Sequence, residues 1–241
     1  SYEMIRYARS KDIFVETCTN GDFVDPEGVI YSDINRISFQ IGGMNQDTHS
    51  RYRVRTHLDK TISKIEELLE LRKKHQRSNV EIEVGFIVMR HNEHQVIEFL
   101  DWAKKIGIDK ANVIDPCARN MLEAYAYLPK DKRYWFYDEE AFEQGILKPK
   151  KIPQNECIWI WNSIQLNWNG DAVPCCRDPN GEYIFGNVFE QGLNCVFNGQ
   201  KAIDFRKKIL SNQKEISICK LCSGYGLPQL GQTKSANFSV E

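Results

Sequence analysis

The sequence predicts an α/β protein: a partial barrel of βα units, followed by a small cysteine-rich domain with a β-hairpin and a helix. Two observations support this prediction. In the first half, short apolar stretches typical of buried strands alternate with amphipathic helical patterns, which indicates a parallel sheet. From Cys157 onward, aromatic residues, glycine turns and six of the eight cysteines are concentrated. We place the boundary so that residues 1–152 hold the barrel with its linker and residues 153–241 hold the second domain.

Hydrophobic periodicity defines the elements of the first half. The pattern predicts, in order, a helix at 2–10, a strand at 13–17, a strand at 34–41, a helix over most of 47–75, a strand at 82–89, a helix at 96–106 and a strand at 113–114. The stretch 82–89 is almost continuously apolar, as expected for a strand buried on both faces of a sheet. Asn92 is the expected N-cap of the helix that follows, and Gly107 its C-cap.

The composition is that of an ordinary globular protein. The chain has 241 residues, of which 41% are hydrophobic and 27% charged, and its net charge is −1. No basic excess suits a phosphate backbone, and the apolar runs are far shorter than the roughly 20 residues that a membrane helix needs. We therefore expect neither nucleic acid nor a membrane as a partner. The charged segment 118–156 is predicted to be a linker with one or two short helices.

The cysteines of the second half carry the strongest chemical signal. The Asn-Gly pair at 169–170 predicts a hairpin, which would bring Cys175 back toward Cys157. Cys219 and Cys222 add two thiols at the CxxC spacing that lets both sulfurs reach one site. Four thiolates suit a tetrahedral zinc ion or a cubane iron–sulfur cluster, and the spacing alone leaves both open. Buried thiols without a metal are the simpler alternative.

Other residues near these cysteines are expected to be structural. Cys176 directly follows Cys175, so on a strand the two side chains would point to opposite faces and only one would bind metal. Cys195 is expected to be a core thiol. Arg177 and Asp178 are expected to lie on the surface.

The segments around the cysteines read Cys157-Ile-Trp, Leu166-Asn-Trp-Asn-Gly-Asp-Ala-Val-Pro-Cys-Cys-Arg-Asp178, Gly186-Asn-Val and Ile218-Cys-Lys-Leu-Cys222. They resemble the SPASM or twitch domain of radical S-adenosylmethionine (SAM) enzymes, which follows a partial (β/α)6 barrel and carries auxiliary 4Fe–4S clusters. The resemblance implies one auxiliary cluster, because no further cysteine follows Cys222. Its implied ligands are Cys157, Cys175, Cys219 and Cys222. A single cluster is the arrangement of the twitch type.

The first half resembles the later part of a radical SAM barrel, with two departures. The segment from Gln40 to Gly43 reads Gln-Ile-Gly-Gly where the family has Ser-x-Asp-Gly, so Gln40 is the implied contact to SAM. Arg53 matches the family's helix arginine and is positioned to meet a carboxylate. The CxxxCxxC motif that holds the SAM-cleaving cluster is not in this sequence. We expect that motif and the first strand to lie upstream of Ser1, so this chain alone is expected not to cleave SAM.

The resemblance implies a cytoplasmic radical SAM oxidoreductase or modifying enzyme. Its substrate would be a peptide or a small carbohydrate-like molecule, and its electron donor a flavodoxin or ferredoxin. The alternative is a non-catalytic binding module on a degenerate barrel, stabilised by zinc or by a cluster. The missing motif and the altered segment at Gln40 favour that alternative for this chain.

Overall fold

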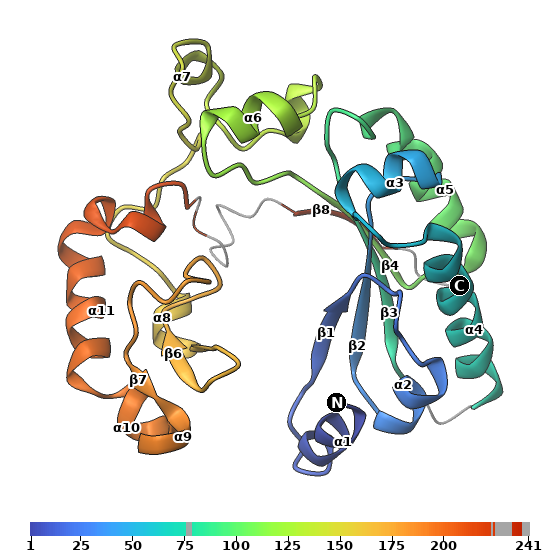
Figure 1. Cartoon of the computed structure of the whole chain (residues 1–241), viewed down its shortest axis with the longest axis horizontal. Coiled ribbons are helices and arrows are strands. Elements are labelled where there is room, and N and C mark those ends of the chain that lie inside the picture. The colour runs from blue at the N-terminus through green and yellow to red at the C-terminus, as the bar shows by residue number, and fades with distance from the viewer. Residues whose placement is uncertain (76–78, 223, 225–232, 238–241) are drawn as a thin grey trace. The chain divides into compact units, whose positions relative to one another are not determined.

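The computed structural model describes residues 1–75, 79–222, 224 and 233–237, and the chain divides into two compact units (Figure 1). The first unit contains residues 1–118 and 122–135, together with a strand from near the C-terminus. The second unit contains residues 119–121 and the chain from residue 136 up to that strand. The boundary expected at 152–153 therefore falls inside the second unit.

A five-stranded sheet forms the centre of the first unit. Its strands stand in the order β1 (Glu16–Thr19), β2 (Arg36–Ile41), β3 (Glu81–Ile87), β4 (Lys110–Ile114) and β8 (Thr233–Asn237). The first four are parallel, as the alternation of strands and helices predicted. The fifth strand, β8, pairs antiparallel with β4 and was not predicted. The strand expected at 13–17 begins three residues later and continues to Thr19.

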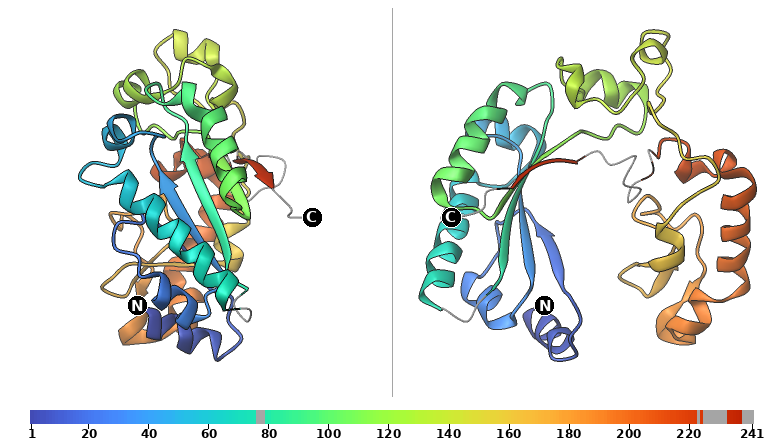
Figure 2. Two further views of the ribbon diagram at one scale, coloured as in Figure 1. Left: turned by 90° about the vertical axis from the view of Figure 1, so that its right-hand side faces the viewer. Right: turned by 180° about the vertical axis from the view of Figure 1, so that it is seen from behind.

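The two faces of this sheet differ in chemistry because side chains alternate along each strand. One face is covered by helices, as both views of Figure 2 show, and it buries a large apolar cluster. Fully buried members of that cluster on the strands are Phe39, Ile82, Val84, Phe86 and Ala111. The opposite face is polar and carries buried Ser38, Glu83 and Asn112. Its charges are paired, since Glu83 lies 3.3 Å from Arg36 and 3.2 Å from Lys110.

The helices of the first unit are α1 (Tyr2–Arg9), α2 (Pro26–Ser32), α3 (Gln46–Tyr52), α4 (Leu58–Lys74) and α5 (Val96–Ile106). Most of 47–75 is helical, as expected, although the chain leaves the helical conformation between α3 and α4. Arg55, in that break, has a left-handed φ of 64°. Gly107 ends α5 in the left-handed conformation, as predicted.

Asn92 does not cap a helix as expected. A short 3₁₀ turn, η1 (Glu93–Gln95), precedes α5, and no side-chain capping bond comes from Asn92. Its side chain is fully buried and instead donates to the carbonyls of Gly42 and Ile87, while accepting from the amide of Met89. Asn92 thus ties together the ends of strands β2 and β3.

The linker segment contains α6 (Met121–Tyr127), η2 (Lys132–Tyr134) and α7 (Glu139–Glu143), which fits the prediction of short helices. The cysteine-rich part that follows combines α8 (Trp159–Asn162), the strands β5 (Gln165–Leu166), β6 (Asp171–Val173) and β7 (Gly186–Asn187), and the helices α9 (Val188–Gln191), α10 (Leu193–Phe197) and α11 (Gln200–Asn212). Two 3₁₀ turns, η3 (Gln213–Glu215) and η4 (Ser217–Cys219), follow α11.

The second unit has its own small core, made of Ile160, Phe205, Ile209 and Ile216. Cys157 and Cys219, which are far apart in the sequence, both pack against this core.

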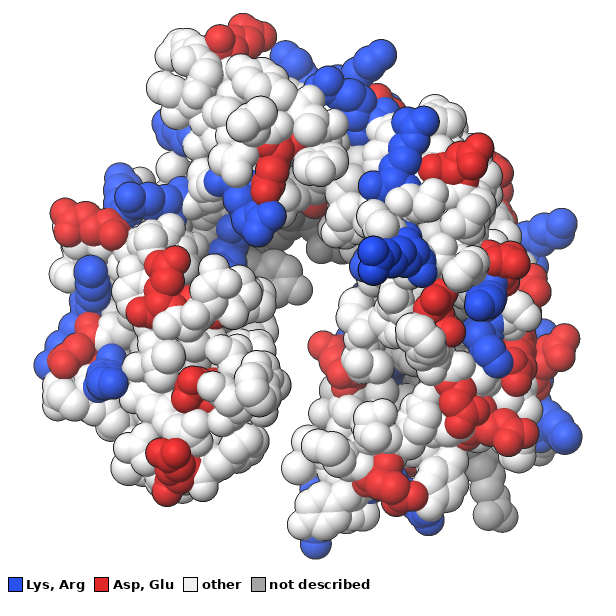
Figure 3. Space-filling model, viewed as in Figure 1, with Lys and Arg blue, Asp and Glu red and all other residues white. Residues whose placement is uncertain are grey.

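Positive and negative side chains are interspersed over the face of the molecule shown in Figure 3. Among the described residues, no helix has both the length and the apolar character to cross a membrane.

Candidate functional site

Four of the eight cysteines are partly buried, and they are the four implied as cluster ligands. Cys157 precedes α8, Cys175 follows β6, Cys219 lies in η4, and Cys222 follows it. The other four, Cys18, Cys117, Cys176 and Cys195, are exposed, and no disulfide links any of the eight. Burial therefore separates the two groups of thiols as the ligand assignment requires.

The hairpin at 169–170 positions Cys175. Strands β5 and β6 pair antiparallel, with Gln165 opposite Val173, and Gly170 closes the turn with a φ of 89°. A side chain at Gly170 would be strained by that φ and would meet the ring of Phe189 at 2.5 Å. The predicted hairpin is thus confirmed, and its second strand leads directly to Cys175.

Backbone amides are directed at the cysteine sulfurs. The backbone N–H groups of Trp159 and Ile160, on α8, donate to Cys157, and that of Arg177 donates to Cys175. The amide of Gly224 donates to the sulfur of Cys222 at 3.4 Å. Such donors favour the thiolate over the thiol, and hydrogen bonds to sulfur are a usual feature of iron–sulfur sites.

The thiols also influence one another electrostatically, so the pKa of one depends on the charge of its neighbours. Burial raises the pKa of Cys175 to about 11, and the nearby charges of Cys176, Cys222 and Cys157 add to that rise. Burial likewise raises the pKa of Cys219 to about 12, with further contributions from Cys222, Cys175 and Cys157. Four thiolates in this place are therefore costly unless a cation compensates them, and binding of a metal centre must release their protons.

The two candidate metal centres differ in the sulfur spacing that they require. Among the described residues, no three His, Cys, Asp or Glu side chains converge as closely as one shared metal ion requires. Zinc with sulfur bonds of about 2.3 Å would hold tetrahedral sulfurs about 3.8 Å apart. In a cubane cluster each thiolate binds a different iron atom, so the four sulfurs lie farther apart.

Two expectations about the neighbouring residues are wrong. Cys195 is exposed rather than a core thiol. Asp178, expected at the surface, is only 1% exposed, and its carboxylate accepts the amides of Glu182 and Tyr183 at 2.7 and 2.9 Å. Asp178 therefore shapes the loop that follows the cysteines. Cys176 is exposed beside partly buried Cys175, in line with one ligand from the pair.

The implied SAM contacts lie in the first unit. Gln40, on β2, donates to the hydroxyl of Ser38 at 3.0 Å and to the sulfur of Cys18 at 3.3 Å. Its amide lies directly over Gly85 of β3, where an added Cβ would meet it at 2.4 Å. Arg53 follows α3, and its Nε is buried with no hydrogen-bond partner among the described residues. No contact recorded in the structure joins Gln40 to Arg53.

Sequence reasoning missed the residues that fix the segment from Gln40 to Gly43. His49 is fully buried, accepts the amide of Gly42 on Nδ1 at 3.2 Å, and lies 2.8 Å through Nε2 from the Thr56 hydroxyl. Burial, followed by the charge of Arg53, lowers the pKa of His49, so its ring is neutral and Nδ1 is free to accept. Helical spacing alone gave no signal for this role.

Comparison with known proteins adds to this picture. Residues 157–223, which include all four partly buried cysteines, match the family model of SPASM, an iron–sulfur cluster-binding domain. These residues form a SPASM domain. No curated protein matches the chain.

Several solved structures share the fold of this chain. SuiB of Streptococcus suis bound to S-adenosylmethionine is 13% identical, with a TM-score of 0.60 over 92% of this chain and 56% of SuiB. SuiB bound to its precursor peptide SuiA gives a TM-score of 0.62 at 13% identity, over 92% of this chain and 57% of SuiB. Native anSMEcpe with bound AdoMet and the Kp18Cys peptide gives 0.56 at 17% identity, over 90% of this chain and 68% of anSMEcpe.

These matches confirm the predicted fold, the later part of a radical SAM barrel followed by a SPASM domain. The chain spans 56% of the length of SuiB.

Proposed function

We propose that this chain is part of a radical SAM enzyme that modifies a peptide. Its SPASM domain would bind one auxiliary 4Fe–4S cluster through Cys157, Cys175, Cys219 and Cys222. The observation that carries the proposal is the set of four partly buried thiols, which interact with one another and receive backbone amides. Peptide substrates are proposed because the SuiB and anSMEcpe structures hold bound peptides.

A cluster is preferred to zinc because the family model that matches residues 157–223 is described as iron–sulfur cluster-binding. We propose a single cluster of the twitch type, since the four partly buried thiols supply one set of four ligands.

The residues of the SPASM domain would bind and shield this cluster. The hairpin and the turn η4 would hold the ligands, and the amides of Trp159, Ile160 and Arg177 would stabilise the thiolates. When bound, the cluster would supply one-electron chemistry or an anchor for substrate. The small apolar core behind Cys157 and Cys219 would limit the access of water.

SAM chemistry is proposed for the whole protein. A segment upstream of Ser1 would supply the CxxxCxxC motif, while Gln40 and Arg53 would contact the amino-acid end of SAM. The buried Nε of Arg53, without a partner among the described residues, supports a role in meeting a carboxylate. We further propose a flavodoxin or ferredoxin as electron donor. A cytoplasmic location would suit eight free thiols, which stay reduced there.

The test is anaerobic reconstitution with iron and sulfide, using a matched pair of variants. The wild type is expected to bind about four irons and four sulfides per chain. Cys175→Ala should abolish the cluster, whereas Cys176→Ala, which removes the exposed neighbour, should keep most of it. Iron and sulfide content, with the visible absorption of the cluster, measures both.

Equal losses in the two variants would refute the ligand assignment. Stoichiometric zinc in the native protein, with no uptake of iron, would favour the zinc-stabilised binding module instead. The SAM part is tested separately by measuring 5′-deoxyadenosine under strong reductant. The chain alone should release none above a protein-free control, and a version extended upstream through the first strand should gain cleavage.

A further inference from the structure

Strand β8 is the outer neighbour of β4 in the five-stranded sheet (Figure 1). It runs antiparallel to β4, with Asn237 opposite Lys110 and Thr233 opposite Ile114, whereas the other strands of the sheet are parallel. The chain from residue 136 up to β8 belongs to the second unit. A segment from the far end of the sequence therefore occupies this edge of the sheet.

The sequence of β8 is poorly suited to a strand. Residues 233–237 read Thr-Lys-Ser-Ala-Asn, in which only threonine is enriched in strands, while lysine, alanine and asparagine are depleted. Strand β3, by contrast, is anchored in the apolar cluster by Ile82, Val84 and Phe86. The pairing of β8 with β4 therefore depends mainly on backbone hydrogen bonds, which any extended segment could make in its place.

The edge of β4 favours a different sequence from that of β8. Ala111 and Val113 belong to the apolar cluster, and β8 has alanine and lysine at the register positions opposite them. Between them lies Asn112, which is only 7% exposed. Its Nδ2 donates to Glu83 at 3.1 Å, but its Oδ1 has no hydrogen-bond partner among the described residues. A strand with apolar residues opposite Ala111 and Val113, and a long side-chain donor opposite Asn112, would therefore pair better.

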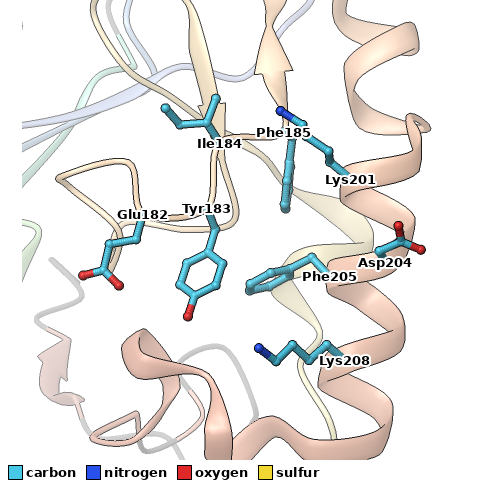
Figure 4. Close-up of a pocket in the computed structure, with 8 residues that line it drawn as sticks. All are labelled: Glu182, Tyr183, Ile184, Phe185, Lys201, Asp204, Phe205 and Lys208. Atoms are coloured by element: carbon cyan, nitrogen blue, oxygen red, sulfur yellow. The ribbon is translucent and has the colours of Figure 1, made fainter.

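The groove between α11 and the segment 182–185, in the second unit, has no comparable selectivity (Figure 4). Lys201 and Lys208 line it together with Glu182 and Asp204, so its charges balance and favour neither an acidic nor a basic partner. The edge of β4 differs, because the pairing of β8 shows the conformation and the direction that a bound segment takes there.

We propose that β8 is a placeholder strand, and that the edge of β4 binds an extended peptide that displaces it. The preferred peptide has two apolar residues with a glutamine between them, so that the glutamine amide donates to Oδ1 of Asn112. This inference rests on the proposed peptide substrate and names the surface where such a peptide docks. Backbone pairing would supply affinity and the alternate side chains specificity. Because β8 competes from within the same chain, the apparent affinity depends on how firmly β8 is held.

The experiment measures the fluorescence anisotropy of labelled Gly-Thr-Val-Gln-Val-Asn-Gly with the full chain. We expect saturable binding with a Kd below about 1 mM. Two variants of β8 should move this affinity in opposite directions. Ser235→Pro/Ala236→Pro removes two adjacent backbone donors and should tighten binding at least fivefold, because it releases the edge. Ser235→Thr/Ala236→Val raises the strand propensity at the same positions and should weaken binding at least threefold.

Changes to the peptide define how it binds. Exchanging both valines for lysine should weaken binding at least fivefold, because the apolar positions are lost. N-methylating the glutamine and the valine after it should abolish binding, because two adjacent backbone donors are lost. Amide hydrogen exchange in residues 110–114 should slow when the unmodified peptide is added. Ile184→Ser, at an exposed position of the groove in the second unit, is the control variant and should leave binding unchanged.

Equal affinity in the wild type and both β8 variants would overturn the inference, because β8 would then not compete with the peptide. Protection from exchange at residues 182–185 instead of 110–114 would also overturn it, by placing the peptide in the groove. So would a proline variant that binds no peptide. The cluster proposal is decided separately by the iron content of the same samples. A chain that binds the peptide but takes up no iron would refute the cluster and leave the docking surface standing.

Discussion

Replacing Arg206 by methionine should destabilise the second unit by about 4 kcal/mol. Arg206 lies on α11 and is only 7% exposed. Its Nε donates to the carbonyl of Ile160 at 3.0 Å and its Nη1 to that of Phe197 at 2.8 Å. The guanidinium also stacks 4.3 Å from the ring centre of Phe197. Arg206 thus ties α11 to both α8 and α10.

The magnitude follows from these contacts. Each hydrogen bond from a charged donor is worth about 1.5–3 kcal/mol, and a desolvated cation–π contact adds about 1–2 kcal/mol. Burial, which lowers the pKa of Arg206, opposes them by disfavouring the charged form. The balance is about 4 kcal/mol. Methionine retains the apolar stem, so the loss reports the guanidinium rather than a cavity.

Urea denaturation of the full chain measures the loss of unfolding free energy and a thermal melt measures the melting temperature, both followed by circular dichroism and tryptophan fluorescence. For a unit of this size each kcal/mol of lost stability lowers the melting temperature by about 4–8 °C. A loss of ~4 kcal/mol should therefore lower the melting temperature by at least about 15 °C. Lys207→Met, at an exposed neighbour, should change stability by less than about 0.5 kcal/mol. A loss below 1 kcal/mol for Arg206→Met would refute the reasoning. Since the amide of Ile160 donates to Cys157, iron content should also fall.

Four further substitutions test the surroundings of single residues. Burial, followed by the charge of Arg53, lowers the pKa of His49, so the unfolded chain takes up a proton near pH 6.5 that the folded chain refuses. Wild-type stability should therefore fall as pH drops below about 6.5. The urea midpoint should fall less between pH 7 and 5.5 for His49→Gln than for the wild type, because the variant lacks the titrating ring. Gly43→Ala should cost roughly 3 kcal/mol in urea denaturation, because an added Cβ would lie 2.6 Å from a backbone nitrogen. Gly85→Ala should cost less than about 1 kcal/mol, because its Cβ meets only the end of a flexible side chain. Asp178→Asn removes one of two acceptors for buried amides and should lower thermal stability by about 1–2 kcal/mol.

The parallel strands were predictable because burial on a sheet leaves a local signal. The apolar run at 82–89 and the helix ending at Gly107 both lie close to where the sequence placed them. The break between α3 and α4 was not, because no Gly or Pro marks residues 53–57, where Arg53, Arg55 and His57 all leave the helical conformation. Helix α2 was missed although Asp25 and Pro26 form a usual helix start. Strand β8 pairs with a partner far away in the sequence, which local periodicity cannot reveal.

The sequence singled out four thiols, whose role as cluster ligands stays a prediction. Cysteine spacing and the hairpin turn pointed to four residues, and those four are the partly buried ones. The roles of Asp178 and Arg206 were hidden because a charged residue is usually exposed and its burial depends on tertiary contacts. The buried ring of His49 was hidden for the same reason.

The alternation along strands β2 to β4 has a consequence for how such proteins diverge. The apolar face packs against helices, where a change of one methylene group is felt, so mutation there is constrained by folding. The polar face, with Arg36, Glu83 and Lys110, shares those strands but not that packing. Natural selection can rewrite one face while leaving the other intact. A substitution on the polar face can therefore change the chemistry that this side of the sheet presents without disturbing the apolar packing behind it.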